Sequence, residues 1–302
     1  MNGNRSTKDL LRHFCLVLFL LHSDSALAER PTIQENEDVR VIFDASLESA
    51  GREVVEMFPL VRREVERALK RRYAGRPTVV LVKDGDTFRR MSGTGLVVAY
   101  ALPQKDVIVI DHSKMGRAPF SLKTILKHEM CHLLLHRSRG GKDLPRWLDE
   151  GIAQWASDGI GEMLMRGNGS VLEDAVVSGK VLSVRVLSDR FPADRDALAL
   201  AYEESKSIVV YIVDEFGVDG LLMILEYLER GEEVDDAVAK ALSVTFEELE
   251  AGWRGRIEGG IAWFTYLAGH LYELVFVLAS LITIVAFVKV IVKKRSYMGR
   301  DE

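Results

Sequence analysis

The thirteen residues from 125 to 137, ILKHEMCHLLLHR, contain three histidines and one glutamate among mostly apolar neighbours. Each residue of an α-helix turns by about 100°, so His128 and His132 project side by side, one turn apart. Two imidazoles with this spacing suit two positions of a tetrahedral zinc site. Glu129 falls within the apolar face, where burial raises the pKa of a carboxylate and a nearby cation lowers it. The segment HEMCH is therefore an HExxH motif, in which two histidines bind a metal and the glutamate takes a proton from activated water.

Other residues of this helix are poorer ligand candidates. His136 lies two turns from His128, about 12 Å along the axis, which is too far for one zinc ion, so we expect it to pack or to cap the helix end. The metzincin pattern is absent, because Leu135 and Ser138 occupy its glycine and histidine positions. Cys131 points away from the two histidines and is expected to be a small buried residue. A pair of hydrogen-bonded helix histidines without metal is the alternative interpretation.

A third metal ligand is expected from residues 144–159, LPRWLDEGIAQWASDG. Pro145 begins a predicted helix with an apolar stripe of tryptophan, leucine and isoleucine side chains, and the preceding loop is short enough for the helix to return along the first one. Asp149 or Glu150 would then face the histidines. The two acids flank the stripe at similar angles, so helical periodicity does not choose between them.

The HExxH motif followed by W-L-x-E-G-x-A at 147–153 resembles the gluzincin metallopeptidases, and specifically the peptidase MA-like family. The resemblance implies that Glu150 is the third zinc ligand and that Asp149 is an ordinary helix acid. It also implies that Gly151 leaves room for close approach of another helix. The 17-residue gap between His132 and Glu150 is slightly shorter than in better-known gluzincins, which affects the expected pocket shape rather than the fold.

The resemblance extends over the C-terminal helices at 199–254 and thus covers most of the chain from the predicted hairpin to Arg254. It implies that Tyr202 faces the metal and donates to the oxyanion, and the alternative is an aromatic side chain packed in the core. Gln154, one turn beyond Glu150, would either orient a metal ligand or serve in packing.

The predicted secondary structure changes along the chain from mixed α/β to nearly all helical. Strands are predicted at 39–43, at 78–82 and in a hairpin between 96 and 111, with a helix at 49–73. Helices then follow at 120–137, 144–157, 196–216, 220–230, 234–242 and 246–257. Residues 159–192 give no clear pattern. We therefore predict an α+β, zincin-like fold, in which a small N-terminal β-sheet packs on the active-site helix and precedes a mostly helical C-terminal lobe.

Residues 1–28 have the pattern of a secretory signal peptide. Basic residues precede the apolar run FCLVLFLL at 14–21, and the sequence ALA at 26–28 offers a small-x-small cleavage site. An uncleaved anchor is the alternative.

A longer apolar segment at 271–292 predicts a C-terminal transmembrane helix and hence a lipid bilayer as partner. Its only charges are Glu273 and Lys289, one near each edge. Basic residues at 293–295 follow it, so the positive-inside rule places the short tail 293–302 in the cytoplasm and the upstream chain outside. A buried core helix is the alternative.

Residues 29–258 are predicted to form one extracytoplasmic domain, or two lobes that share a cleft. Once the signal has been removed, Cys131 is the only cysteine, so no disulfide within the chain is possible. The net charge of −5 and the lack of a basic face with interleaved aromatics exclude nucleic acid as an expected partner. The oligomeric state cannot be inferred.

Together these features predict a membrane-anchored zinc metallopeptidase whose domain lies in a periplasm or at a cell surface. His128, His132 and Glu150 would hold Zn²⁺, Glu129 would be the general base, and Tyr202 would stabilise the oxyanion. The partner would be a peptide or protein substrate, held by β-addition to an exposed edge of the hairpin. The alternative is a non-catalytic membrane receptor or assembly factor that keeps a peptidase-like fold.

Overall fold

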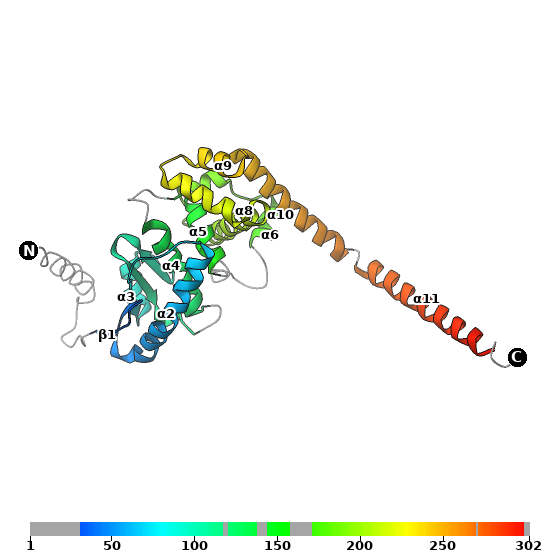
Figure 1. The fold of residues 1–302 in the computed structure, drawn as a ribbon, viewed down its shortest axis with the longest axis horizontal. Helices are drawn as coiled ribbons and strands as arrows, with labels where there is room; N and C mark the ends of the chain where they lie inside the picture. Colours follow the sequence, from blue (N-terminus) through cyan, green and yellow to red (C-terminus); the bar gives the residue numbers. More distant parts are fainter. Residues whose placement is uncertain (1–30, 117–119, 138–143, 158–170, 270, 299–302) are drawn as a thin grey trace, which may run out of the picture.

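The computed structural model describes residues 31–116, 120–137, 144–157, 171–269 and 271–298 (Figure 1). Within these ranges, a five-stranded sheet is followed by a helical lobe, and two long helices then lead away from the body of the molecule. The architecture is therefore mixed α+β and mostly helical, as predicted. The expected signal peptide at 1–28 lies outside the described residues.

The sheet has the strand order β1-β2-β3-β5-β4. Its strands are β1 (Thr32–Glu35), β2 (Arg40–Phe43), β3 (Thr78–Val82), β4 (Ala99–Leu102) and β5 (Val107–Asp111). Strands β2, β3 and β5 are parallel, whereas β1 and β4 pair in antiparallel fashion at the two edges. The predicted hairpin is thus present as β4 and β5, while β1 was not predicted because its four residues bear no apolar alternation strong enough to stand out.

The central strands are apolar on both faces because helices cover both faces. Val79 and Leu81 of β3 belong to the main core, whereas Val80 and Val82 pack in a smaller cluster on the opposite face. Two helices, α2 (Glu48–Ala68) and α4 (Leu122–Arg137), pack on the main-core side. Continuous runs such as TVVLV are typical of parallel strands that are buried in this way.

The opposite face is covered by α3 (Gly85–Ser92), a helix that was not predicted. Its first turn is capped by the Asp84 side chain, which accepts a hydrogen bond from the Thr87 N–H at 2.7 Å. Gly93 ends it in the left-handed conformation, with φ of 72°. Phe88 is its single buried side chain, and two large apolar residues in eight, Phe88 and Met91, give too little periodicity to recognise from sequence.

The helical lobe consists of α5 (Arg146–Ala156), α6 (Val171–Ser178), α7 (Val184–Asp189), α8 (Arg195–Glu229), α9 (Val234–Leu242) and α10 (Phe246–Gly269). The long α8 replaces the two helices predicted at 196–216 and 220–230, but its backbone is non-helical at Gly217, with φ of 75° and ψ of 166°. A backbone break therefore lies between the two predicted segments. Helix α10 continues past the predicted end at residue 257.

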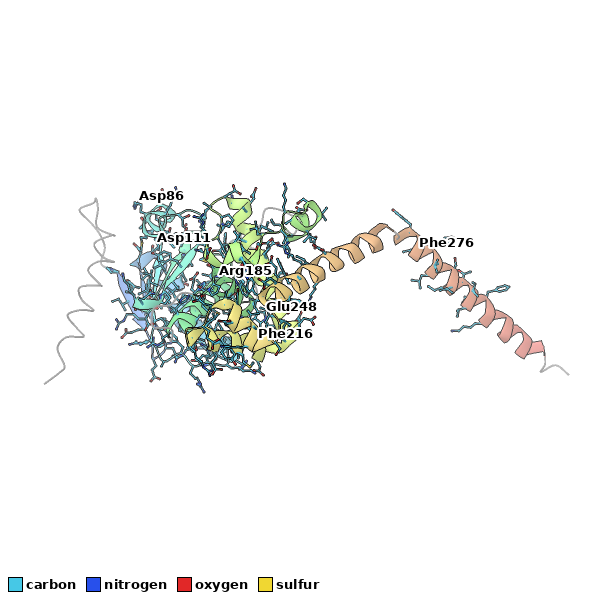
Figure 2. All side chains as sticks on the ribbon, turned by 90° about the horizontal axis from the view of Figure 1, so that it is seen from above. Asp86, Asp111, Arg185, Phe216, Glu248 and Phe276 are labelled. Carbon is cyan, nitrogen blue, oxygen red and sulfur yellow. The ribbon has the colours of Figure 1, made fainter. Side chains whose placement is uncertain are left out.

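The C-terminal segment forms α11 (Leu271–Met298), and large apolar side chains on it are exposed, Phe276 among them (Figure 2). Across the part of the chain that the structure describes, however, no helix is both long and apolar enough to cross a membrane. Spanning a bilayer takes about 20 predominantly apolar residues in one helix. The segment predicted to span the membrane, 271–292, is therefore helical, but the described residues do not support a membrane span.

Candidate active site and metal centre

Helix α4 lies between the sheet and the helical lobe and is buried on nearly all sides. His128 and Glu129 are 6% and 5% exposed, so both polar side chains stand in an otherwise apolar interior. The two imidazole rings of His128 and His132 lie with their centroids 4.8 Å apart, as expected for residues one helical turn apart. Buried polar groups of this kind need partners, and those partners come from α5.

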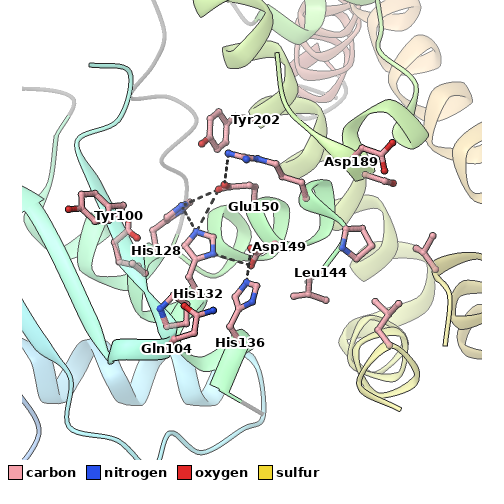
Figure 3. Close-up of a pocket in the computed structure, with 18 of the residues that line it drawn as sticks. Tyr100, Gln104, His128, His132, His136, Leu144, Asp149, Glu150, Asp189 and Tyr202 are labelled. Carbon is pink, nitrogen blue, oxygen red and sulfur yellow. Dashed lines mark hydrogen bonds and ion pairs between the residues drawn. The ribbon is translucent and has the colours of Figure 1, made fainter. Parts of the chain in front are cut away.

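Helix α5 brings Glu150 to the two histidines (Figure 3). Its Oε2 atom lies 3.5 Å from Nε2 of His128 and 3.6 Å from Nε2 of His132. The two Nε2 atoms are themselves 3.1 Å apart. The structure thus gathers all three predicted metal ligands, with one donor atom of each facing the other two.

This triangle of donor atoms has the dimensions of a zinc site. Two ligands about 2.05 Å from a zinc ion at tetrahedral angles lie about 3.3 Å from each other. The observed separations of 3.1, 3.5 and 3.6 Å bracket that value. Two imidazoles and one carboxylate also match the donor set of catalytic zinc sites, which leave a fourth position open. The residues present therefore fit a divalent metal such as zinc.

Glu129 lies next to this triangle without being part of it. Burial raises its pKa above the ordinary value, and the nearby His128 and His132 oppose that shift. Burial also acts on Glu150, but hydrogen bonding and charge from the histidines outweigh it and lower the pKa of this carboxyl. The pKa values of the two carboxyl groups thus shift in opposite directions. Glu129 readily holds a proton and can act as a base, whereas Glu150 is an anionic ligand.

Asp149 corrects one prediction, because it is not an ordinary helix acid. Its Oδ1 lies 3.0 Å from Nδ1 of His132, and its Oδ2 lies 2.9 Å from Nε2 of His136. Although burial opposes both shifts, this pairing raises the pKa of His132 to about 10 and lowers the pKa of Asp149. A carboxylate that accepts the Nδ1–H leaves Nε2 as the metal-facing nitrogen and fixes the ring orientation. Both acids that helical periodicity left open therefore face His132, Asp149 at Nδ1 and Glu150 at Nε2.

His136 and Cys131 lie where the argument from the helix placed them, outside the metal triangle. His136 packs against Asp149 near the end of α4. Cys131 is fully buried, and burial raises the pKa of its thiol far above the ordinary value. A buried neutral thiol is a poor metal ligand and a poor nucleophile.

Helix α8 places Tyr202 above the triangle, on the opposite side of the cleft from Tyr100 (Figure 3). Burial raises the pKa of its phenol well above the ordinary value, and the Glu150 carboxylate raises it further. The hydroxyl is therefore neutral and available as a hydrogen-bond donor. Its role in catalysis stays a prediction.

Two small features of α5 hold α8 in place. Gln154 is fully buried and donates from Nε2 to the backbone carbonyl of Tyr202 at 2.8 Å, so it ties the two helices together rather than orienting a metal ligand. A Cβ atom at Gly151 would lie only 2.3 Å from the carbonyl oxygen of Ser205. Only glycine permits this close approach of α5 and α8, as the resemblance implied.

A cleft of about 950 Å³ contains these groups. One wall is β4 with the turn that follows it, which contributes Ala99, Tyr100 and Gln104. Because β4 is the last strand of the sheet, its outer edge has no neighbouring strand among the described residues. The opposite wall comes from α5, the end of α7 and the segment around 228–234.

Arg146 is the residue of the cleft that the sequence analysis overlooked. It is the first residue of α5, and its Nη2 lies 3.7 Å from Oε1 of Glu150. The signal was present in the sequence, since an arginine four residues before a glutamate on a helix can form an ion pair.

Fold and site together define a class: an α+β protein in which a buried helix supplies two histidines and a following helix supplies a glutamate to one open metal-binding position. A family model described as the Peptidase MA superfamily matches residues 91–259, which is more than half of the chain. The chain therefore belongs to the peptidase MA superfamily. A comparison with curated proteins finds no match.

Proposed function

We propose that this protein is a gluzincin-type zinc peptidase that hydrolyses peptide bonds in the cleft between β4 and α5. The observation that carries the proposal is the triangle of His128, His132 and Glu150 donor atoms, with Glu129 beside it. Membership of the peptidase MA superfamily supports the same reaction class.

Zinc held by the triangle would act as a Lewis acid toward the substrate carbonyl and would acidify a water molecule. Glu129, whose pKa is raised by burial, would accept a proton from the attacking water and deliver it to the leaving amine. Tyr202, neutral and facing the cleft, would donate its hydroxyl to the oxyanion of the tetrahedral intermediate. Asp149 would keep the His132 ring in position throughout.

The outer edge of β4 supports a peptide substrate in particular. This edge lines the cleft with His128, and no strand among the described residues pairs with it, so an extended chain could add there. A peptide that adds as a further strand would run past the metal triangle with its carbonyl groups at regular spacing.

The test uses the full-length protein with a zinc measurement and a quenched-fluorescence peptide library. Glu129→Gln should keep bound zinc and lower kcat by about 10²- to 10⁴-fold, because it removes the proton acceptor and leaves the three ligands in place. Glu215→Gln, an exposed position on α8, is the matched control and should cleave as the wild type does. Undiminished cleavage by the Glu129 variant would refute the mechanism. Bound zinc without any cleavage by the wild type would instead indicate a binding module.

We further propose that the domain works outside the cytoplasm. The signal-peptide pattern at 1–28 supports this location. N-terminal sequencing of the protein produced in its own cells should begin at Glu29. A mature chain that begins at Met1 and is found only in the cytosolic fraction would refute the proposal.

A further inference from the structure

Arg146 has an unusual place in the cleft, because it is the only lysine or arginine among the described residues that line it. Six acids share that lining: Glu129, Asp149, Glu150, Asp189, Glu232 and Glu233. The Arg146 side chain is about half-exposed, at 48%, whereas Glu150, with which it pairs, is 12% exposed. A single cation thus meets a buried carboxylate at the rim of the proposed metal centre.

The two oxygens of Glu150 have different neighbours. Oε2 faces the Nε2 atoms of His128 and His132 at 3.5 and 3.6 Å. Oε1 faces Nη2 of Arg146 at 3.7 Å. Charge attraction at this distance favours the carboxylate orientation that directs one oxygen to the histidines and the other to Arg146, because a carboxylate turned out of this plane would lose its cation.

The same guanidinium also contacts the aromatic side chains beside it. It lies over the Phe191 ring, 5.0 Å from the centroid, and Phe191 in turn meets Tyr202 edge to face at 5.2 Å and 87°. The Phe191 ring thus lies between the Arg146 guanidinium and the Tyr202 ring and contacts both, so a shift of the guanidinium is transmitted to the phenol. A planar guanidinium can stack on one ring and still donate sideways to other groups, whereas an ammonium has no flat face with which to stack.

We propose that Arg146 is a positioning residue that holds the Glu150 carboxylate with one oxygen turned toward the metal and, through the Phe191 ring, holds the Tyr202 side chain over the cleft. This inference rests on the proposed zinc peptidase function. It predicts that one side chain, which touches neither metal nor peptide, sets both the affinity of the metal site and the placement of the oxyanion donor.

The two contacts can be separated by two substitutions in the full-length protein. Arg146→Gln removes the charge, so zinc affinity should fall by about 10- to 100-fold, the usual loss when a partner of a metal ligand is removed. Arg146→Lys keeps a charge near Glu150 but loses the stacking on Phe191. It should therefore recover most of the zinc affinity while kcat stays low. Arg52→Gln is the control, since it removes an exposed Arg–Glu pair with the same spacing on α2.

Zinc Kd is measured by competition with a chelator, and kcat and KM are measured at saturating zinc. A lower kcat with an unchanged KM is expected for both Arg146 variants. When Tyr202→Phe is combined with either of them, the double variant should have nearly the same kcat as the Arg146 variant alone. Zinc affinity and kcat of Arg146→Gln within twofold of Arg52→Gln would overturn the inference. A change in KM alone, confined to substrates with a free C-terminal carboxylate, would overturn it too and assign Arg146 to substrate binding. If the wild type cleaves nothing, the peptidase proposal fails, and the zinc Kd values still decide the role of Arg146 at Glu150.

Discussion

A methyl group added at Gly151 should push α5 away from α8 and so displace the neighbouring Glu150, which the proposed metal centre needs. The added Cβ would lie 2.3 Å from the Ser205 carbonyl oxygen and 2.7 Å from Cγ2 of Val209. Ordinary contact begins near 3.4 Å, so relief of the clash requires a displacement of roughly 1 Å. The carbonyl is part of the α8 backbone and cannot rotate away as a side chain would.

The expected cost follows from that displacement. Overpacking of a buried site destabilises a protein by about 1–3 kcal/mol, against a gain of about 0.5–1 kcal/mol from replacing a helical glycine by alanine. Glu150 is the neighbouring residue, and zinc ligands tolerate errors of only about 0.2 Å. A shift of 1 Å at the reacting groups costs about 100-fold in rate. Gly151→Ala should therefore lower the free energy of unfolding, zinc affinity and kcat together.

The assay is urea unfolding of the full-length protein, with zinc Kd and peptide cleavage measured on the same samples. Gly255→Ala is the matched control, because it is also a glycine-to-alanine change within a helix, and no atom lies within 4 Å of the added Cβ. The control should be as stable as the wild type or more stable. If Gly151→Ala matches the control in stability and zinc affinity, the close approach of α5 and α8 does not position Glu150, and the reasoning fails.

Three further predictions concern single side chains. Asp149→Asn should weaken zinc binding by about 10- to 100-fold in chelator competition, because the charged partner of His132 is lost, and unchanged affinity would contradict that role. Tyr202→Phe should lower kcat by about 10²-fold or more with little change in KM, and a change in KM alone would indicate packing instead. Burial raises the pKa of Glu204 to about 8, so the folded protein keeps a proton there that the unfolded chain has released above about pH 4.5. The stability that the neutral form provides is therefore lost as pH rises from about 4.5 to 8. Glu204→Gln can still accept a hydrogen bond from the Leu182 N–H and should remove this loss of stability. The measurement is the free energy of unfolding of both proteins between pH 5 and 8, and the same pH dependence in both would refute the prediction.

Much of the fold could be predicted from local pattern. Helix α4 and the later helices have an apolar periodicity that backbone geometry imposes on any amphipathic helix, and strands β2, β3 and β5 are short apolar runs bounded by turn residues. The strand β1 and the helix α3 were missed because each is short and has too few apolar residues for a recognisable period. The membrane span was predicted from hydropathy alone, and the described helices do not support it.

The sequence by itself determined the chemistry available: HExxH spacing places two imidazoles and a carboxylate on one helix, and the segment at 147–153 places two more carboxylates on the next helix. Only the tertiary structure decided which of the two acids on α5 contacts which ring nitrogen of His132. Asp149 and Glu150 differ by one residue, and their positions relative to the histidines depend on how α4 and α5 cross. The same holds for Arg146, which contacts Phe191, 45 residues away in the chain, and through it the Tyr202 ring. Helical periodicity is a local property of the backbone, whereas such contacts exist only after separate helices have packed together.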